Sequence, residues 1–198
     1  LDMLYQYDSF LDSLNVIADM GCGEGLDTQW WAELMTRDDP PQPHKYTVYA
    51  VDKDIKKIDP AILKANKNIK TFEADFDTVH LPRKVDLLWS HDSFQFATDP
   101  YKCLSNWKRT LNVNGMLMLT VPQTTYLYNN SLVIANNNQY NNFTDSSLTN
   151  LFYDFVVFDK REIVTGDTNR TKALKLMLWE YDYQIFYETN LEIGRAHV

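Results

Sequence analysis

Cysteine is scarce in this sequence of 198 residues, which contains only Cys22 and Cys103. Two cysteines cannot build a disulfide framework, and these two lack the spacing of metal ligands, so we expect no metal site. Apolar runs are also short, and none approaches the roughly 20 residues that a transmembrane helix requires. No basic segment followed by an apolar stretch, the pattern of a signal peptide, is visible near residue 1. These absences favour a protein of the reducing cytoplasm, without a membrane partner.

Basic residues are also fewer than acidic ones: the chain has 19 Lys and Arg residues and 27 Asp and Glu residues, which gives a net charge of −8. A field of this sign repels phosphate backbones, so we expect no nucleic-acid partner. The same field suits a cationic small-molecule ligand. The length and the 44% share of hydrophobic residues predict one packed domain. Nothing in the composition indicates the oligomeric state.

Short apolar runs alternate along the chain with segments of helical periodicity. Strands are expected at residues 15–20, 46–51, 69–74, 85–90 and 116–121, and helices at 1–14, 26–37, 60–65 and 100–111. A turn is expected at Asn114-Gly115, before the last of these strands. Nearly continuous apolar strands are typical of a parallel sheet buried on both faces. The pattern therefore predicts an α/β fold, a Rossmann-like doubly wound sheet with helices on both faces.

The sequence becomes strongly polar after Pro122. Seven of the residues from 129 to 142 are asparagines, so we expect a polar loop or lid at about 123–144 rather than a core element. A helix at 148–155 and two long strands, 155–164 and 173–183, are expected to follow. The two strands are joined by a hairpin turn at 165–169.

The two ends of the sequence differ from the rest. The chain begins with Leu1 instead of Met and enters directly into helical sequence, which indicates a piece of a longer environmental sequence. Residues 193–198 match the translation of a common sequencing adapter, so we expect a non-native tail. We assign residues 1–192 to a single domain.

Acids, glycines and one histidine follow the ends of the first four expected strands. The groups are Asp19 with Gly21, Gly23 and Gly25; Asp52; Asp75 with Phe76; and Ser90, His91 and Asp92. Ligands of open parallel sheets bind outside the carboxyl ends of the strands, so these groups should face one crevice. Glycines allow close approach of a ligand to the backbone, and the following helix offers N–H groups to an anionic end. An acid can accept both ribose hydroxyls, and an acid followed by Phe can accept from an adenine amino group while the ring packs on the base.

This ordered set resembles the class I S-adenosylmethionine-dependent methyltransferases, of the small-molecule type with domains such as methyltransferase domains 11 and 25. The resemblance covers about residues 1–183. It implies that Asp19 and the Gly21–Gly25 turn, Cys22 included, hold the methionine part of the donor S-adenosyl-L-methionine. It also implies that Asp52 holds the ribose, that Asp75 and Phe76 hold the adenine, and that Lys53 and Ser90 are among the residues that bind the donor. The sheet would then have seven strands, the last one antiparallel.

Three other functions remain open. A nicotinamide-dependent dehydrogenase would require G-x-G-x-x-G, but Leu26 occupies the third glycine position and Gly25 comes one residue early. Aminopropyl transfer uses the same fold, but we find no acidic diamine signature. A non-catalytic regulator or subunit that binds S-adenosylmethionine is compatible with an intact donor site.

His91 is the candidate catalytic residue on the acceptor side. It could act as a general base, position the acceptor, or be a hydrogen-bonded structural histidine. Because His91 and Asp92 are adjacent, we expect them to point apart on an extended chain and to make a poor metal pair. Asp27 is expected to be a first-turn helix acid that interacts favourably with the helix dipole.

Overall fold

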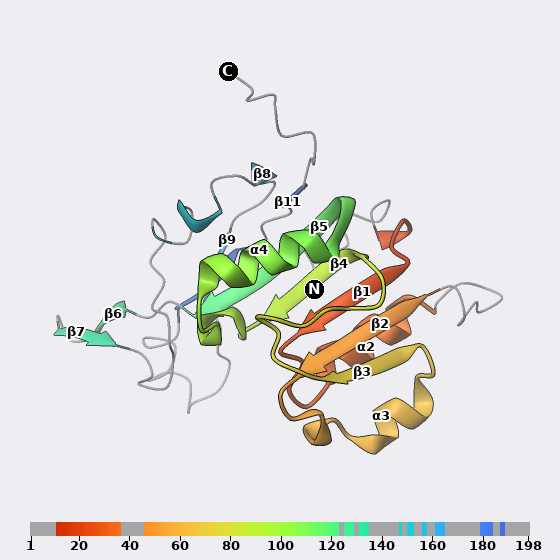
Figure 1. Ribbon diagram of the computed structural model, residues 1–198. Helices are drawn as coiled ribbons and strands as arrows, with labels where there is room; N and C mark the ends of the chain where they lie inside the picture. Colours follow the sequence, from red (N-terminus) through yellow and green to blue (C-terminus); the bar gives the residue numbers. More distant parts are fainter. Residues whose placement is uncertain are drawn as a thin grey trace.

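The structure, a computed structural model, describes residues 11–36, 46–122, 125–128, 131–134, 147, 150–152, 156–157, 161–164, 179–183 and 187–188. Five parallel strands form its centre in the spatial order β3-β2-β1-β4-β5 (Figure 1). Their bounds are Val16–Met20 for β1, Thr47–Asp52 for β2, Ile69–Glu73 for β3, Val85–His91 for β4 and Leu111–Pro122 for β5. The five predicted strands and the Rossmann-like α/β fold class are thereby confirmed.

Helices cover both faces of this sheet, because successive residues of each strand point to opposite sides. On one face, Ile17 of β1 belongs to the same buried cluster as Trp31 of α2 (Leu26–Leu34). On the other face, Ala18 shares a larger cluster with Trp107 of α4 (Pro100–Thr110). In Figure 1, α4 crosses in front of the sheet and α2 lies behind it. All five residues of β1 are consequently buried, as their apolar run predicts.

Two of the helices begin with the same short signal, an Asp followed by Pro. In α3 (Pro60–Ala65) the Asp59 side chain accepts from the Ala61 N–H, and in α4 the Asp99 side chain accepts from two backbone N–H groups. Proline fits the first helical position because it has no N–H to leave unpaired there. Short-range chemistry therefore sets these two helix starts, and both were predicted at the observed residue.

Strand β5 begins earlier than predicted. The expected turn at Asn114-Gly115 lies inside it as an irregularity: Val85 pairs with Leu111 but Leu87 pairs with Met116. Asn114 has a φ of 61° at this point. A Cβ on Gly115 would lie 2.8 Å from the carbonyl oxygen of Asn112. The local turn chemistry is present, but pairing with β4 on both sides of it makes one bulged strand.

Further strands lie beyond β5. The strand β10 (Trp179–Tyr183) pairs antiparallel with β5, and β9 (Arg161–Val164) pairs antiparallel with β10. Two small antiparallel pairs were not predicted, namely β6 (Thr125–Tyr128) with β7 (Ser131–Ile134), and β8 (Val156–Val157) with β11 (Tyr187–Glu188). Both β6 and β7 lie within the range 123–144, expected to be a polar loop or lid, where asparagines flank two short runs that can pair. The lid stays a prediction. Two 3-10 helices, η2 (Ile55–Lys57) and η3 (Phe94–Phe96), were also not predicted.

Several expectations fall outside the described residues. These are the greater part of the helix at 1–14, the hairpin turn at 165–169 and the tail at 193–198. Of the helix expected at 148–155, the described residues Asn150 and Leu151 are helical. Within the described ranges, every helix is too short or too polar to cross a membrane.

Candidate functional site

The glycine turn joins the end of β1 to α2 and passes over the end of β2. The N–H groups of Gly21 and Cys22 both donate to the carbonyl oxygen of Val51, at 2.8 and 3.0 Å. Gly21, Gly23 and Gly25 have φ values of 82°, 53° and 83°, in the left-handed region that favours glycine. The backbone path of the turn therefore accounts for all three predicted glycines.

Gly23 differs from its two neighbours in the space beside it. A Cβ on Gly21 would lie 2.3 Å from the Cβ of Ser93, and one on Gly25 would lie 2.9 Å from Cγ2 of Ile58. A Cβ on Gly23 would meet no atom within 4 Å. Packing fills the first two positions, whereas the backbone at Gly23 borders open space that a ligand could occupy. The residues present therefore fit a bound nucleoside donor at this turn.

Asp52 lies at the end of β2 and is bonded directly to the glycine turn. One oxygen of its carboxylate accepts from the Gly23 N–H at 3.0 Å, and the other accepts from the Asp54 N–H at 2.9 Å. The structure thus brings together two groups that the sequence placed in one crevice. Asp52 therefore orients the turn, and the remaining lone pairs of its carboxylate can accept hydrogen bonds from a ligand.

The third strand end is arranged differently from the prediction. Lys53 reaches across from β2 to form an ion pair with Asp75 at 2.9 Å, and the other Asp75 oxygen accepts from the Asp77 N–H. Phe76 is only 8% exposed, and its ring packs against Trp107 with a centroid distance of 6.0 Å. Both carboxylate oxygens already have partners, and the ring belongs to the core. Adenine binding by this pair therefore stays a prediction.

Asp19 is a buried acid at the centre of the sheet edge. It is 2% exposed, and its Oδ2 accepts from the Thr28 hydroxyl at 2.5 Å. Burial raises the pKa of Asp19 to about 7, and the Thr28 hydrogen bond opposes this only in part. A nearby cation would favour the ionised form of this carboxyl, so the position suits an ammonium group.

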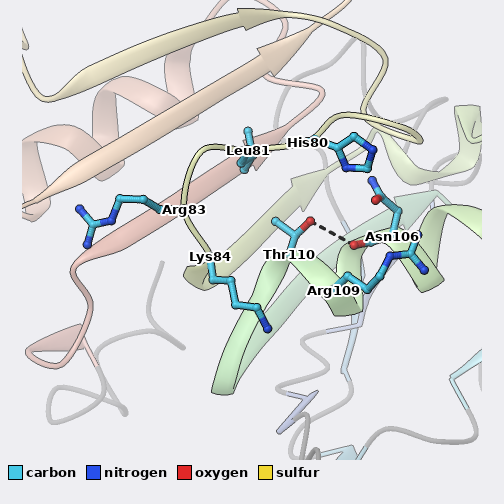
Figure 2. A pocket seen from close by; sticks show the side chains of 7 residues that line it. All are labelled: His80, Leu81, Arg83, Lys84, Asn106, Arg109 and Thr110. Atoms are coloured by element: carbon cyan, nitrogen blue, oxygen red, sulfur yellow. Dashed lines mark hydrogen bonds between the residues drawn. The ribbon is translucent and has the colours of Figure 1, made fainter.

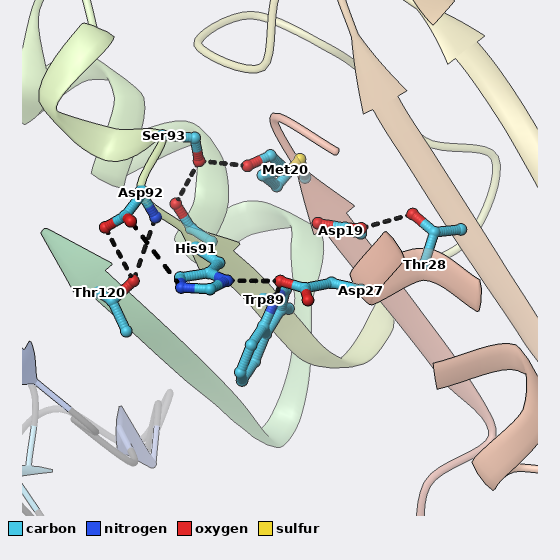
Figure 3. A network of polar contacts seen from close by, with 10 residues as sticks. Asp19, Met20, Asp27, Thr28, Trp89, His91, Asp92, Ser93 and Thr120 are labelled. Carbon is cyan, nitrogen blue, oxygen red and sulfur yellow. Dashed lines mark hydrogen bonds and ion pairs between the residues drawn. The ribbon is translucent and has the colours of Figure 1, made fainter. Parts of the chain in front are cut away.

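Ser90 holds the loop after β4 against the end of β1. Its hydroxyl lies 2.7 Å from that of Ser93. Ser93 in turn donates to the carbonyl oxygen of Met20 at 2.5 Å, as Figure 3 shows. Ser90 is buried, so the structure gives it a positioning role between strands. Its predicted contact with the donor is not tested by these bonds.

His91 is exposed at the end of β4 and forms a short hydrogen bond to a residue of another element. Its Nδ1 lies 2.7 Å from Oδ2 of Asp27, in the first turn of α2, and the same oxygen accepts from Nε1 of Trp89 at 3.0 Å. Burial would raise the pKa of Asp27, but the bonds from His91 and Trp89 outweigh it and hold the pKa below its usual value. Because an ionised Asp27 only accepts, Nδ1 of His91 carries a proton.

The expectation that His91 and Asp92 point apart is wrong. Asp92 has a φ of 48°, so the chain is not extended there, and its carboxylate lies 3.9 Å from Nε2 of His91. The Asp92 N–H donates to Thr120 of β5, at both its carbonyl and its hydroxyl oxygen, which fixes the turn (Figure 3). The imidazole therefore lies between two carboxylates. Even so, the described residues contain no group of three potential metal ligands.

Cys22 has no sign of a nucleophile. It is 8% exposed within the glycine turn, and burial raises the pKa of its thiol far above the usual value. A thiol kept protonated does not attack carbon or sulfur centres. Its place in the site is that of a small residue in a tight turn.

Sequence reasoning missed the acceptor-side partners of His91. Asp27 was assigned to the helix dipole, and Trp89 was not assigned to the site. No short motif links Asp27 to His91, since 64 residues separate them. The only available signal was the acid in the first turn of the helix that follows the glycines.

Comparisons with known proteins agree with this arrangement. A family model described as "Methyltransferase domain" matches residues 18–119. A comparison with curated proteins gave no significant match. The fold is similar to that of the 1,6-didemethyltoxoflavin-N1-methyltransferase of Burkholderia thailandensis, with 17% identity, a TM-score of 0.61, and coverage of 87% of this chain and 71% of that one.

Two other solved structures are similar. One is TehB from Haemophilus influenzae, with 17% identity, a TM-score of 0.60, and coverage of 86% of this chain and 57% of that one. The other is a SAM-dependent methyltransferase from Aquifex aeolicus, with 15% identity, a TM-score of 0.59, and coverage of 90% and 86%. The chain thus spans little more than half the length of TehB. At these identities the likeness shows a shared fold.

Proposed function

Because the chain belongs to the methyltransferase domain family, whose model matches just over half of its residues, we propose that it transfers a methyl group from S-adenosyl-L-methionine to a small-molecule acceptor. The observation that carries this proposal is the turn at Gly23. Its backbone borders open space, and its N–H is held by Asp52, an acid suited to a ribose. The relative from Burkholderia thailandensis, solved with S-adenosylhomocysteine and its small-molecule acceptor bound, supports the substrate class.

Different residues of the chain would bind different parts of the donor. S-adenosylmethionine supplies a methyl group already activated by the positive charge of its sulfonium. The buried carboxyl of Asp19 suits the ammonium group, Asp52 and Lys53 the ribose, and Asp75 with Phe76 the adenine side. The half-buried acids Asp27, Asp52 and Asp92 at this edge favour a cationic ligand over a neutral one. What remains for the protein is to hold donor and acceptor in line and to exclude water.

His91 would position the acceptor at the same edge. Asp27 fixes the ring by accepting from Nδ1, and Nε2 on the other side of the ring faces the Asp92 carboxylate at 3.9 Å. Alignment alone lowers much of the barrier for a sulfonium donor, so we assign His91 to positioning rather than obligatory proton removal. The Trp89 ring, edge-on to His91 at 6.0 Å, restricts the ring further.

Calorimetry with S-adenosylmethionine, S-adenosylhomocysteine and NADH tests the proposal directly. We expect binding of the first two without added metal and no binding of NADH. Binding of NADH with no response to the other two would overturn it in favour of a dehydrogenase. Turnover of S-adenosylmethionine with a pool of metabolites then separates an enzyme from a regulator that only binds the donor.

The cellular setting is part of the proposal. Cys22 and Cys103 are both free and buried, which agrees with a reducing compartment. We therefore propose that the protein works in the cytoplasm. The turnover rate would depend on the methyl acceptor, which the residues proposed for the donor site do not identify.

A further inference from the structure

A second pocket lies at the opposite edge of the sheet from the glycine turn. It has a volume of about 250 Å³ and is bordered by the segment before β4 and the last turns of α4 (Figure 2). Its lining residues are His80, Leu81, Arg83, Lys84, Asn106, Arg109 and Thr110. The pocket thus lies where β4 and β5 begin, whereas the donor site lies where the parallel strands end.

Basic side chains gather at this pocket although the chain as a whole is acidic. Four of the seven lining residues are His, Lys or Arg, in a chain with a net charge of −8. Figure 2 shows Lys84 and Arg109 bordering the same opening, with His80 beyond Asn106, while Arg83 extends away from them. Two like charges at one pocket repel each other, and an anion bound between them would remove that repulsion.

No described carboxylate neutralises these charges. The ion pairs formed by Lys53, Lys57, Lys102 and His91 include none of the residues that line this pocket. Arg109 donates to a neutral partner, the hydroxyl of Ser105, at 3.0 Å. The adjacent acid Asp86 is occupied elsewhere, since its carboxylate accepts from the N–H groups of Asn15 and Val16 and from the amide of Asn112.

The floor of the pocket is polar, neutral and fixed. The buried Asn106 side chain donates to the carbonyl oxygen of Val79 at 3.0 Å, and the buried Thr110 hydroxyl donates to the carbonyl oxygen of Asn106 at 3.0 Å (Figure 2). The Asn106 bond holds the segment before β4 against α4, so the pocket exists before any ligand arrives. The lysine and arginine at the rim are exposed and can adjust to an anion.

We propose that this pocket binds the phosphate group of a small anionic ligand, separately from the donor site. Guanidinium and ammonium groups are the usual partners of phosphate oxygens, and arginine can bind two of them at once. The volume lies below the roughly 300–1,000 Å³ of pockets that enclose drug-sized ligands, so it suits a phosphate group and its nearest atoms. The ligand could be a phosphate monoester or free phosphate.

Titration calorimetry with glycerol 3-phosphate, inorganic phosphate and glycerol at low salt tests this site. We expect the wild-type protein to bind one or both phosphates, with affinity that falls as salt rises, and not to bind glycerol. Tighter binding of glycerol 3-phosphate would identify a monoester site, and equal binding a site for the phosphate group alone. The double variant Lys84→Gln/Arg109→Gln should weaken binding at least about tenfold, because two charged contacts are lost.

The control is the double variant Lys64→Gln/Lys67→Gln, which removes the same charge from exposed positions near α3. It should change phosphate affinity less than about twofold, since distant exposed charges are screened. S-adenosylhomocysteine is titrated into all three proteins, and its affinity should be unchanged. Absence of phosphate binding in the wild type, equal loss in both variants, or displacement of phosphate by S-adenosylhomocysteine would each overturn the proposal. Failure of S-adenosylhomocysteine to bind would instead overturn only the proposed methyl transfer.

Discussion

The two edges of the parallel sheet are built in opposite ways. The edge where the strands end is acidic, and its acids are held by hydrogen bonds, Asp52 by the Gly23 N–H and Asp19 by the Thr28 hydroxyl. The edge where β4 begins carries exposed basic side chains above a neutral floor. The net charge of the chain therefore does not describe either edge, because the fold places acidic side chains at one edge and basic side chains at the other. Substitutions at the first edge should alter both structure and binding, and substitutions at the second should alter binding alone.

The largest expected effect is that of Gly23→Val on donor binding. The side chain would occupy the open space beside the turn and would also be strained at a φ of 53°. We expect the affinity for S-adenosylhomocysteine to fall by at least about 100-fold, or about 2.7 kcal/mol. Gly23→Asn is the matched control for backbone strain. Asn tolerates this conformation but still fills the space, so the affinity for S-adenosylhomocysteine should fall here too. Full affinity in a folded Val variant would refute the role of this turn.

Asp52→Ala should have the next largest effect. Removal of a charged acceptor is expected to weaken binding of S-adenosylhomocysteine by about 1–3 kcal/mol. Because Asp52 also accepts from the Gly23 and Asp54 N–H groups, the free energy of unfolding should separately fall by ~1 kcal/mol. Calorimetry and urea unfolding measure the two effects. Lost stability with unchanged affinity would make Asp52 purely structural.

The acceptor side should respond in turnover rather than in donor affinity. We expect His91→Ala and Asp27→Asn each to lower turnover about tenfold, because each loosens the ring that aligns the acceptor. His91→Asn should keep much of the rate, since Asn can still form a hydrogen bond. If Asp27 acts through His91, the double variant should be no slower than the slower single variant. If the two single variants lose turnover additively in the double variant, or if both single variants keep wild-type turnover, Asp27 does not act through His91.

The smallest expected effect is the pH dependence that comes from Asp19. Its folded pKa of about 7 lies above its ordinary value of 3.8, so its contribution to stability is present below pH 3.8 and is lost as the pH rises towards 7. Asp19→Asn cannot ionise, and its free energy of unfolding should fall less over this range, by at least about 1 kcal/mol. Urea unfolding of both proteins between pH 4.5 and 8 provides the measurement. Parallel pH curves would contradict the raised pKa.

The described residues of 11–36 and 46–122 were largely predictable because their signals are local. An Asp-Pro pair begins α3 and α4, and apolar runs mark the five parallel strands. The segment after Pro122 was not, since β6 and β7 are short runs among asparagines that gain stability only by pairing. The bulge at Asn114 was read as a turn because its local chemistry is that of a turn. Pairing with β4 extends the strand through it.

The sequence by itself determined where the groups that we propose for the donor site would lie. Glycines at left-handed positions and acids at strand ends act through the backbone conformation beside them, and parallel strands bring these ends to one edge. The tertiary structure alone decided which side chains meet there. Asp27 reaches His91, Ser93 fills the space beside Gly21, and Phe76 enters the core, because each contact joins segments far apart in the chain. Such contacts depend on the packing of α2 and β4 against β1, which no local pattern encodes.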